Sequence, residues 1–488
     1  MCRRLSAFAL AIAGLAAALA PSPLTAQVIF RRTYGGTGND YGYSVRQTAD
    51  SGYIIVGHTL SFGSDSADVY LVKTDADGDT SWTKTFGGAD NDYGWSVRQT
   101  SNGGYIIAGI TFSFGRPGGE VYLIRTNAAG ELQWSRTFGG SNSDHGCDIE
   151  QTVDGGFIVA GKYGRATGYD DVFLVKTDSL GDTRWTRTYG GDSSECGWAV
   201  QQTEDGGYVV AGNTNSLGNG ESDAYLLRVD ADGDTLWTRT FGGAGFEGAY
   251  SVQQTADRGY ILAGETESFG AGIRDVYLIK TDTNGNALWS KTFGGTDRDD
   301  GSSVRRTTDG GYIIVGSTES YGAGDVDVYL IKTNASGDTL WTRTCGGRDW
   351  EIGKSVRQAA DGGYIIAGHT ESFGAGLIDV YLIKTDSLGI STAVEETKTT
   401  PTRAGALSLS CEPNPFAGRT TVRLSPGAIR HSPLTLRVYD AQGRLVHSAF
   451  EIRASSFPLD MRSMPAGAYF IRCDAAGEHA TTRIILQR

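Results

Sequence analysis

The stretch Gly87-Gly-Ala-Asp-Asn-Asp-Tyr-Gly-Trp-Ser-Val-Arg-Gln-Thr-Ser-Asn-Gly-Gly-Tyr-Ile-Ile-Ala-Gly109 is one copy of a unit that the chain repeats seven times. Each copy opens with a Gly-Gly pair that follows a Thr and, in six copies, an aromatic residue. The first glycine of the pair stands at Gly35, Gly87, Gly139, Gly190, Gly242, Gly294 and Gly346. A period of about fifty residues indicates stacked supersecondary units.

Within one copy, short apolar runs alternate with turn residues. The first copy predicts strands at Ser44–Thr48, Tyr53–Thr59, Val69–Asp75 and Thr80–Thr85. Tyr, Ile, Val, Thr and Trp dominate these runs, and Asp, Asn and Gly fill the gaps between them, as is typical of strands joined by hairpin turns. Four strands in each of seven units predict an all-β fold, a seven-bladed β-propeller.

The way in which the ring closes can also be predicted. Six copies end their fourth strand on a tryptophan, at Trp82, Trp134, Trp185, Trp237, Trp289 and Trp341, whereas the seventh copy lacks that strand. The segment Val28–Thr33 precedes the first Gly-Gly pair and has Phe30 at the tryptophan position. We therefore expect residues 27–34 to complete blade seven, which removes an exposed sheet edge.

The rest of the chain divides into segments of different composition. Residues 1–26 have Arg3 and Arg4, an apolar run and a small-residue end at Ala26, and this pattern indicates a secretory signal peptide. The apolar run is shorter than the ~20 residues that cross a bilayer, and we expect no transmembrane segment in the mature chain. The propeller then spans 27–390, a polar linker spans 391–404, and a second domain spans 405–488.

The charge is unevenly distributed between these parts. The chain carries a net charge of −13, but residues 1–26 carry +2 and residues 405–488 carry +4, so the propeller holds −19. Such an acidic surface argues against nucleic acid and anionic membranes as partners. Cys147, Cys196 and Cys345 lie on different blades, and we interpret them as small buried hydrophobic residues.

The tail beyond residue 404 predicts a small Ig-like β-sandwich. Its short apolar runs predict strands at Leu407–Cys411, Thr420–Leu424, Leu434–Tyr439, Leu445–Glu451, Ala468–Arg472 and Thr481–Leu486. Cys411 and Cys473 lie in two different strands, where a disulfide is one option in an oxidising compartment.

The tail also resembles a known family. The residues that carry the resemblance are Asn414, Pro415 and Phe416 near its start, Tyr439, Asp440 and Gly443 in its central hairpin, and Gly467 and Tyr469 near its end. They resemble the C-terminal sorting domain of type IX secretion, and a related bacterial Ig-like module is the alternative. The resemblance implies passage to the periplasm, an interaction with the type IX secretion machinery, and release from the cell or display on its outer surface.

The propeller repeats resemble two propeller families in part. Asp68-Val-Tyr followed by a strand, a turn and Trp82 is similar to Kelch blades, but Kelch blades carry a Gly-Gly pair where this chain has the single Gly57. The spacing from Asp75 to Gly78 and Trp82 is similar to the docking segment of quinoprotein propellers, one residue short. We interpret both as shared solutions to one hairpin geometry and assign the repeats to neither family.

Two rings of acidic residues recur in every unit. The first comprises Asp40, Asp92, Asp144, Glu195, Glu247, Asp299 and Glu351, and the second Asp68, Glu120, Asp171, Asp223, Asp275, Asp327 and Asp379. Sevenfold recurrence favours a structural role in which the carboxylates accept backbone N–H bonds. The alternative is calcium, for which the turn Asp75–Asp79 has suitable oxygen ligands.

Positions that break the sevenfold symmetry are the better candidates for a ligand site. They are Tyr41, Tyr43, Tyr93, Trp95, His145, Lys162, Tyr163, Arg165, Trp198 and Trp350. Aromatic and basic side chains at the mouth of a propeller suit a sugar or a peptide. The alternative is that these rings pack between blades as core.

The sequence contains no metal-binding spacing, nucleophile elbow or phosphate loop that would indicate an enzyme. We therefore interpret the protein as an exported, non-enzymatic binding or structural module. A secreted carbohydrate-active hydrolase or lyase with an active site at the channel mouth is the alternative.

Overall fold

The computed structural model describes residues 28–391, 409–412, 419–424, 434–440, 445–452, 456–475 and 478–486. The predicted signal peptide and nearly all of the linker lie outside these residues, as do Asn414, Pro415, Phe416 and Gly443.

Seven four-stranded antiparallel sheets follow one another along the chain. Blade one has β2 (Asp40–Gln47), β3 (Tyr53–Thr59), β4 (Asp68–Thr74) and β5 (Thr80–Phe86); blade two has β6 (Asp92–Gln99), β7 (Tyr105–Thr111), β8 (Glu120–Thr126) and β9 (Leu132–Phe138). Blade three has β10 (His145–Gln151), β11 (Phe157–Gly164), β12 (Asp170–Thr177) and β13 (Thr183–Tyr189); blade four has β14 (Glu195–Gln202), β15 (Tyr208–Thr214), β16 (Asp223–Val229) and β17 (Thr235–Phe241). Blade five has β18 (Glu247–Gln254), β19 (Tyr260–Thr266), β20 (Asp275–Thr281) and β21 (Ala287–Phe293); blade six has β22 (Asp299–Arg306), β23 (Tyr312–Thr318), β24 (Asp327–Thr333) and β25 (Thr339–Cys345). Blade seven has β26 (Glu351–Gln358), β27 (Tyr364–Thr370), β28 (Asp379–Thr385) and, from the other end of the domain, β1 (Phe30–Tyr34).

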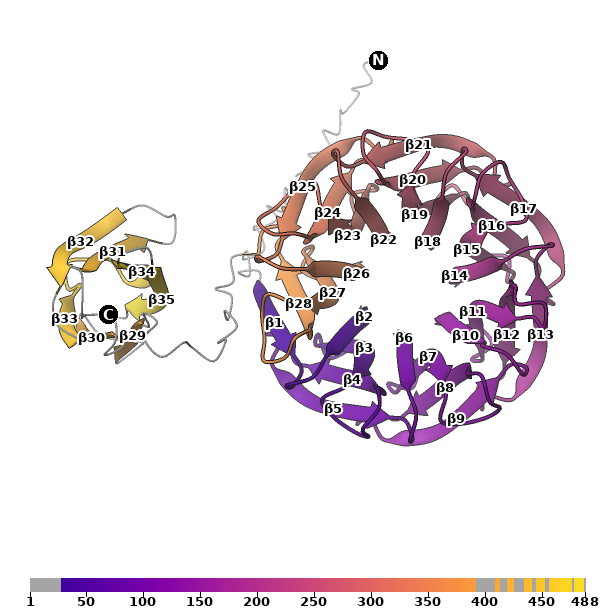
Figure 1. The fold of residues 1–488 in the computed structure, drawn as a ribbon, viewed down its shortest axis with the longest axis horizontal. Coiled ribbons are helices and arrows are strands. Elements are labelled where there is room, and N and C mark those ends of the chain that lie inside the picture. Colours follow the sequence, from indigo (N-terminus) through magenta and orange to yellow (C-terminus); the bar gives the residue numbers. More distant parts are fainter. Residues whose placement is uncertain are drawn as a thin grey trace, which may run out of the picture.

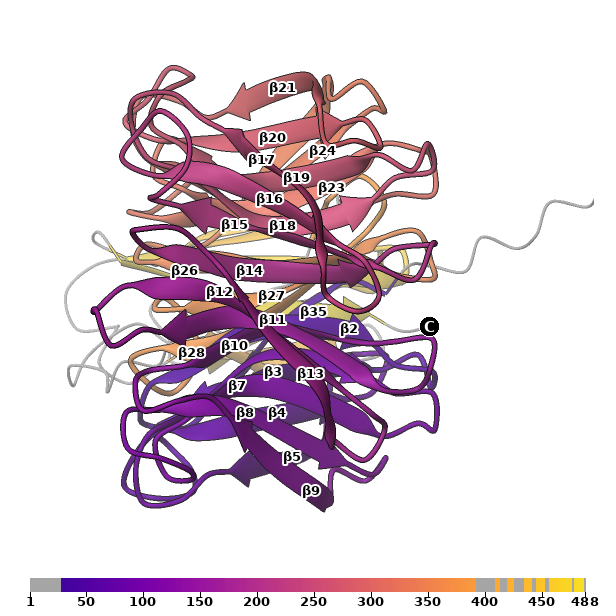
Figure 2. The ribbon, with the colours of Figure 1, turned by 90° about the vertical axis from the view of Figure 1, so that its right-hand side faces the viewer.

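The blades are arranged around a central axis as a seven-bladed β-propeller. The first strand of every blade lies innermost, around the axis, and the fourth lies at the rim (Figure 1). Outer strands such as β13 and β17 cross the side of the disc (Figure 2). Because each inner strand follows a Gly-Gly loop and ends at a tight turn, all seven inner strands run from one face of the disc, the loop face, to the other, the turn face.

Blade seven is completed by the N-terminal strand. β1 pairs antiparallel with β28, and Phe30 lies opposite Lys384 just as Trp82 lies opposite Lys73 in blade one. The ends of the domain are thereby joined within a single sheet, so the circle has no unpaired seam.

The first strand of each blade begins earlier than the sequence predicted. Blade one starts at Asp40 instead of Ser44 because the strand contains a β-bulge, at which Tyr43 is the extra residue between Gly42 and Ser44. The neighbouring strand carries Gly57, where a Cβ atom would lie 1.6 Å from the carbonyl oxygen of Tyr41. This close approach explains the single glycine, and the bulge moves Tyr41 and Tyr43 from a loop into the inner strand.

The hydrophobic core consists of clusters that lie between neighbouring blades. One of them joins Ile54 and Val56 of blade one to Val97 and Tyr105 of blade two, with Trp82 packed against it. The middle strands β3 and β4 are buried at every position, which explains their continuous apolar runs.

The Gly-Gly pair is required by close packing between the two acidic rings. A Cβ atom on Gly35 would lie 2.1 Å from the carboxylate of Asp379 and 2.5 Å from that of Asp40. No side chain fits between these two carboxylates, so the glycine recurs in every blade.

The described part of the tail forms two facing sheets. One has the order β29 (Leu409–Glu412), β30 (Arg419–Leu424), β33 (Ser456–Asp460); the other has β32 (Leu445–Ile452), β31 (Leu434–Asp440), β34 (Gly467–Ala475), β35 (Glu478–Leu486). Buried Val422 and Leu459 from the first sheet and Val438 and Ile471 from the second share one core, as expected for a sandwich. β33 was missed from the sequence because it contains Pro458, and it is accommodated as an edge strand.

Candidate functional site

The bulges aim seven side chains into the central channel near its loop face. The bulged residue of each blade lines the same cavity of about 100 Å³, and together they form a ring of Tyr43, Trp95, Cys147, Trp198, Tyr250, Ser302 and Lys354. Bulges commonly re-aim side chains beside functional sites. This bulge ring varies from blade to blade, unlike the repeated core residues.

The aromatic part of the ring belongs to a larger cluster on blades seven, one and two, which we call the aromatic mouth. Tyr43 lies 4.6 Å from Trp95 between ring centroids. Tyr41 stacks on His58 at 4.5 Å and meets His369 edge-on at 4.9 Å. Tyr93 completes the cluster, 4.7 Å from His58 and 6.1 Å from Trp95.

The imidazoles of the mouth are neutral at physiological pH. Burial lowers the pKa of His58 to about 4 and that of His369 to about 3. The mouth is therefore an uncharged surface of stacked rings, of the kind that packs against the apolar face of a ligand.

The opposite side of the channel, on blades five and six, carries charged side chains. The hydroxyl of Tyr250 donates to Glu265 Oε1 at 2.5 Å, and Arg274 Nη1 lies 3.1 Å from the same oxygen and 3.9 Å from Asp300 Oδ1. Burial, and then the carboxyl of Asp300, raise the pKa of Glu265 to about 7. Glu265 is therefore partly protonated near neutral pH.

The structure brings some of the predicted site residues together and separates others. Tyr41, Tyr43, Tyr93 and Trp95 form the aromatic mouth described above. Across the channel, Trp198 lies 5.9 Å from Tyr250 and donates from Nε1 to Asn213 Oδ1 at 2.8 Å.

The blade-three candidates make local contacts. Lys162 pairs with Asp170 at 3.0 Å, and His145 lies opposite Lys162 in the strand register. Tyr163 packs in the core between blades two and three, 5.3 Å from Phe173.

Arg165 ties the shortened blade-three loop to blade four. Its Nη1 donates to the carbonyl of Gly191 at 2.9 Å, Nη2 donates to the carbonyl of Ser193, and Nε lies 3.3 Å from Asp171. Trp350 is 49% exposed on the loop before β26 and does not line the channel cavities described here.

Sequence reasoning missed His58, Glu265, Asp300, Lys354 and His369. Glu265 and both histidines stand at one register position, directly after the single glycine of the second strand. That position differs from blade to blade, which was the signal that identified the other candidates. It lies at the end of an apolar run, inside the predicted strand Tyr53–Thr59, and such a run does not distinguish a channel position from a core position.

The two acidic rings are engaged within their loops. Asp40 accepts the backbone amide of Gly36 at 2.7 Å and the hydroxyl of Ser61 at 2.6 Å, and Asp68 accepts the amide of Ser64 at 2.5 Å. In the turn considered for calcium, Asp75 Oδ1 accepts the amides of Asp77 and Asp79. These bonds agree with a structural role for the recurrent carboxylates.

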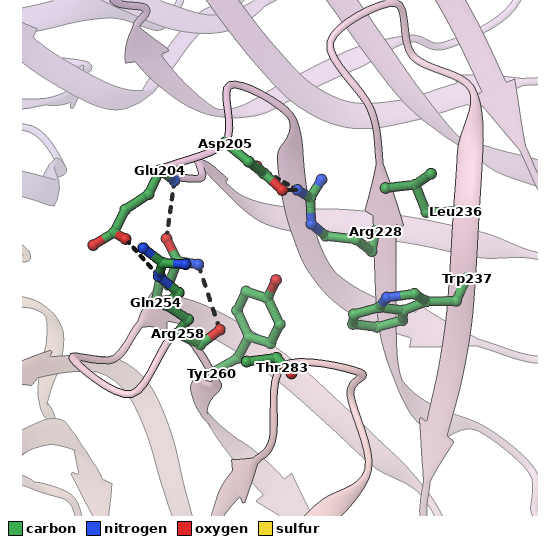
Figure 3. A pocket seen from close by; sticks show the side chains of 9 residues that line it. All are labelled: Glu204, Asp205, Arg228, Leu236, Trp237, Gln254, Arg258, Tyr260 and Thr283. Atoms are coloured by element: carbon green, nitrogen blue, oxygen red, sulfur yellow. Dashed lines mark hydrogen bonds and ion pairs between the residues drawn. The ribbon is translucent and has the colours of Figure 1, made fainter.

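A cavity of about 450 Å³ lies away from the channel, between blades four and five (Figure 3). Arg228 pairs there with Asp205 at 2.6 Å, and Trp237 meets Tyr260 edge-on at 5.9 Å. The same Trp–Tyr pair recurs at the other seams, for example between Trp82 and Tyr105 at 5.9 Å. The recurrence marks this cavity as part of the blade packing.

Two cysteines that the sequence placed on separate blades are neighbours. Cys147 of blade three and Cys196 of blade four interact across the seam, and burial together with the Cys147 thiol raises the pKa of Cys196 well above its usual range. Cys196 is buried, as predicted, whereas Cys147 lines the channel and is partly exposed.

The described residues of the tail agree with its resemblance to a sorting domain. Tyr469 is buried, and its hydroxyl donates to the carbonyl of Pro465 at 2.7 Å, which fixes the start of β34. The sequence profile of the family described as "Secretion system C-terminal sorting domain" matches residues 412–487.

Residues 412–487 form a type IX secretion sorting domain. The sorting domain directs the protein to the outer surface or the medium and implies an interaction with the secretion machinery. No helix in the described part of the chain is long and apolar enough to span a bilayer.

Part of the chain is similar to a longer bacterial protein. The Regulatory protein FlaEY of Caulobacter vibrioides is 27% identical over 232 residues, which cover 42% of this chain and 24% of that protein's length. The protein described here therefore spans only about a quarter of that relative.

Solved structures are similar to this chain at low identity. The Neurospora crassa Pan2 WD40 domain is 11% identical, with a TM-score of 0.43 and coverage of 77% of this chain and 99% of that one. Puromycin hydrolase is 15% identical, with a TM-score of 0.47 and coverage of 81% of this chain and 61% of that one. An ancestral GH74 enzyme is 10% identical, with a TM-score of 0.43 and coverage of 94% of this chain and 64% of that one. These similarities concern the fold alone.

Proposed function

We propose that this secreted propeller is a non-enzymatic binding module that takes a glycan or a peptide at the aromatic mouth. The observation that carries the proposal is the continuous cluster formed by Tyr41, Tyr43, Tyr93 and Trp95 with two neutral histidines. Stacking on such rings is worth about 1 kcal/mol per ring beyond the buried area, enough for recognition when several rings act together.

Unpaired polar atoms at the mouth support the same reading. Trp95 Nε1, His58 Nδ1 and His369 Nδ1 are buried and have no hydrogen-bond partner among the described residues. Buried polar atoms normally have partners, and here the hydroxyl or amide groups of a ligand would supply them.

One observation favours an enzyme as the second candidate. Glu265 and Asp300 are neighbouring carboxylates, and the raised pKa of Glu265 lets it hold a proton at neutral pH, which suits a general acid in a hydrolase or lyase. Arg274 pairs with both carboxylates, which also suits a purely structural network.

The test uses the full mature chain on arrays of glycans and extended peptides, followed by product analysis of every ligand that binds. Retention of an intact ligand supports the binding module. Cleavage of the ligand that slows when Glu265 is replaced supports the enzyme. Binding that survives when Tyr43 and Trp95 are both replaced by alanine contradicts a site at the mouth.

A further inference from the structure

The turn-face half of the channel has a different character from the mouth. Three positions after each bulge, every inner strand places one residue in the channel: Arg46, Arg98, Glu150, Gln201, Gln253, Arg305 and Arg357. This arginine ring lines a cavity of about 260 Å³, together with Asp148 of blade three. Its four arginines come from the consecutive blades six, seven, one and two (Figure 1).

The positive charge of the arginine ring is largely unpaired. Arg98 Nη2 lies 2.8 Å from Asp148 Oδ1, but Arg46, Arg305 and Arg357 have no ion-pair partner in the described part of the chain. Glu150 is occupied elsewhere, because its Oε2 accepts the backbone amide of Gln202 at 2.6 Å.

Each of these three guanidinium groups is held by hydrogen bonds from Nη1, and Arg305 Nη1 also donates to Ser251 Oγ of blade five at 3.0 Å. Nη1 of Arg46, Arg305 and Arg357 donates to the carbonyl of the preceding valine on its own strand, at 2.7, 2.6 and 2.5 Å. An arginine has five N–H donors in a planar fork, so further donors of each group remain for the channel.

The ring also changes the backbone hydrogen bonding between blades. The amides of Gln202, Gln254 and Arg306 donate to Glu150, Gln201 and Gln253 of the preceding blade, at 2.6, 2.6 and 2.8 Å. An arginine side chain has no acceptor atom, so the equivalent amides that follow an arginine-bearing blade cannot donate such a bond to it. They belong to Gln47, Gln99, Gln151 and Gln358. One arc of the channel is therefore rich in donors and poor in acceptors.

Buried arginines this close together destabilise the fold unless a counterion neutralises their charge. Burial, and then the neighbouring arginines, lower the pKa of Arg46 and Arg357 well below the usual range, and burial with Arg98 lowers that of Arg305 to about 10. Four arginines against Glu150 and Asp148 leave an excess charge of +2 inside a propeller of net charge −19.

We propose that the arc of Arg305, Arg357, Arg46 and Arg98 binds a doubly charged oxyanion, phosphate or sulfate, as a free ion or as the charged group of a larger ligand. Guanidinium forks bind such oxygens in pairs, and a dianion matches the excess charge of the ring. The site adjoins the bulge ring, because Arg46, Arg305 and Arg357 also line the cavity of that ring. It does not depend on the function proposed for the aromatic mouth.

The blades themselves supply the test variant. Blades four and five carry Gln201 and Gln253 at the arginine position, so Arg305→Gln with Arg357→Gln introduces a side chain that the fold already accepts there. The control is Arg306→Gln, which removes a charge from the exposed end of β22, next to the ring.

The full-length protein in phosphate- and sulfate-free buffer is titrated calorimetrically with sodium phosphate, sodium sulfate, glucose 6-phosphate and a sulfated disaccharide, with sodium chloride at equal ionic strength. We expect saturable binding of a dianion that is more than tenfold weaker in the double variant and unchanged in Arg306→Gln. Without ligand, the double variant is expected to melt at a higher temperature than the parent, because like charges are removed.

The outcomes separate the two sources of the anion. Binding of the inorganic ions assigns a free-ion site, and binding of only the sugar esters assigns the charged group of a larger ligand. No binding by the parent, equal binding by parent and double variant, or an equal response to chloride would overturn the proposal.

Discussion

The ring of Phe30 meets the ring of Tyr53 edge-on, with their centroids 6.0 Å apart. Trp82 takes the same position against Tyr105 one blade further on, at 5.9 Å. A residue from the start of the propeller thus fills the place that a tryptophan fills in the other blades, and it packs against blade one while its strand belongs to blade seven.

Replacing Phe30 by alanine should destabilise the whole ring. Phe30 is 3% exposed, and truncation of a buried phenylalanine costs about 3–5 kcal/mol. Phe30→Trp should keep or raise the stability, since it restores the residue of the other blades. Chemical denaturation measures both, with Val28→Ala, at an exposed position, as the control. A Phe30→Ala protein as stable as the parent would contradict the role of β1 in closure.

Removing residues 405–488 should change where the protein goes and leave the propeller folded. The deletion takes no strand from any of the seven blades. We expect the truncated chain to accumulate in the periplasm with the melting temperature of its propeller unchanged, as measured by cell fractionation and calorimetry. Normal display of the truncated chain at the cell surface would show that its export does not need the sorting domain.

Replacing Tyr43 and Trp95 by alanine should weaken ligand binding more than it lowers stability. Both rings face the channel, and each stacked ring contributes about 1 kcal/mol, so the double variant should bind roughly tenfold or more weakly. Phe114→Ala, at an exposed ring on an outer loop, is the matched control. A fall in stability of 3 kcal/mol or more, in the range of about 3–5 kcal/mol for a core aromatic, would instead identify the two rings as core.

The stability of the propeller should depend on Glu265 in a defined pH window. Its carboxyl keeps its proton up to about pH 7 in the folded protein, whereas the ordinary pKa is 4.5. The folded state therefore binds the proton more tightly, and the free energy of unfolding falls as the pH rises from 4.5 to 7.

Glu265→Gln removes this dependence, because an amide has no proton to lose. The free energy of unfolding of the variant, relative to that of the parent, should rise by up to about 3 kcal/mol between pH 5 and pH 8. Each unit of pKa shift corresponds to about 1.4 kcal/mol. Denaturation at both pH values measures the gain. Glu267→Gln, at a partly exposed partner of Arg274, should show no such gain, and an identical response of the two variants would refute the assignment to Glu265.

The repeat made the architecture predictable, because turn glycines and apolar runs are local signals. The fold class and the antiparallel blades are confirmed. The bulge at Tyr43 was not predictable in the same way, since it depends on the approach of Gly57 to the Tyr41 carbonyl on the paired strand. Pro458 concealed β33 for a similar reason: only its edge position in the sheet makes the strand tolerable.

The candidate site was predictable as a set of variable positions and not as a geometry. Tyr41 and Trp95 were found because they break the symmetry, but so did Tyr163, and only the three-dimensional contacts separate a channel ring from a core ring. The arginine ring was not predicted, because the sequence Ser-Val-Arg-Gln is typical of an ordinary strand whose arginine lies in solvent. Its meaning depends on seven strands meeting around one axis, which no single repeat encodes.

The pairing of β1 with β28 also determines when the propeller can close during synthesis. A ribosome makes Phe30 more than 350 residues before Lys384, the residue that it faces. Until that distant strand emerges, the first segment has no sheet to join, and the growing stack of blades ends in an uncovered apolar face that favours association with other chains. The ring can therefore close only after the whole propeller has been synthesised.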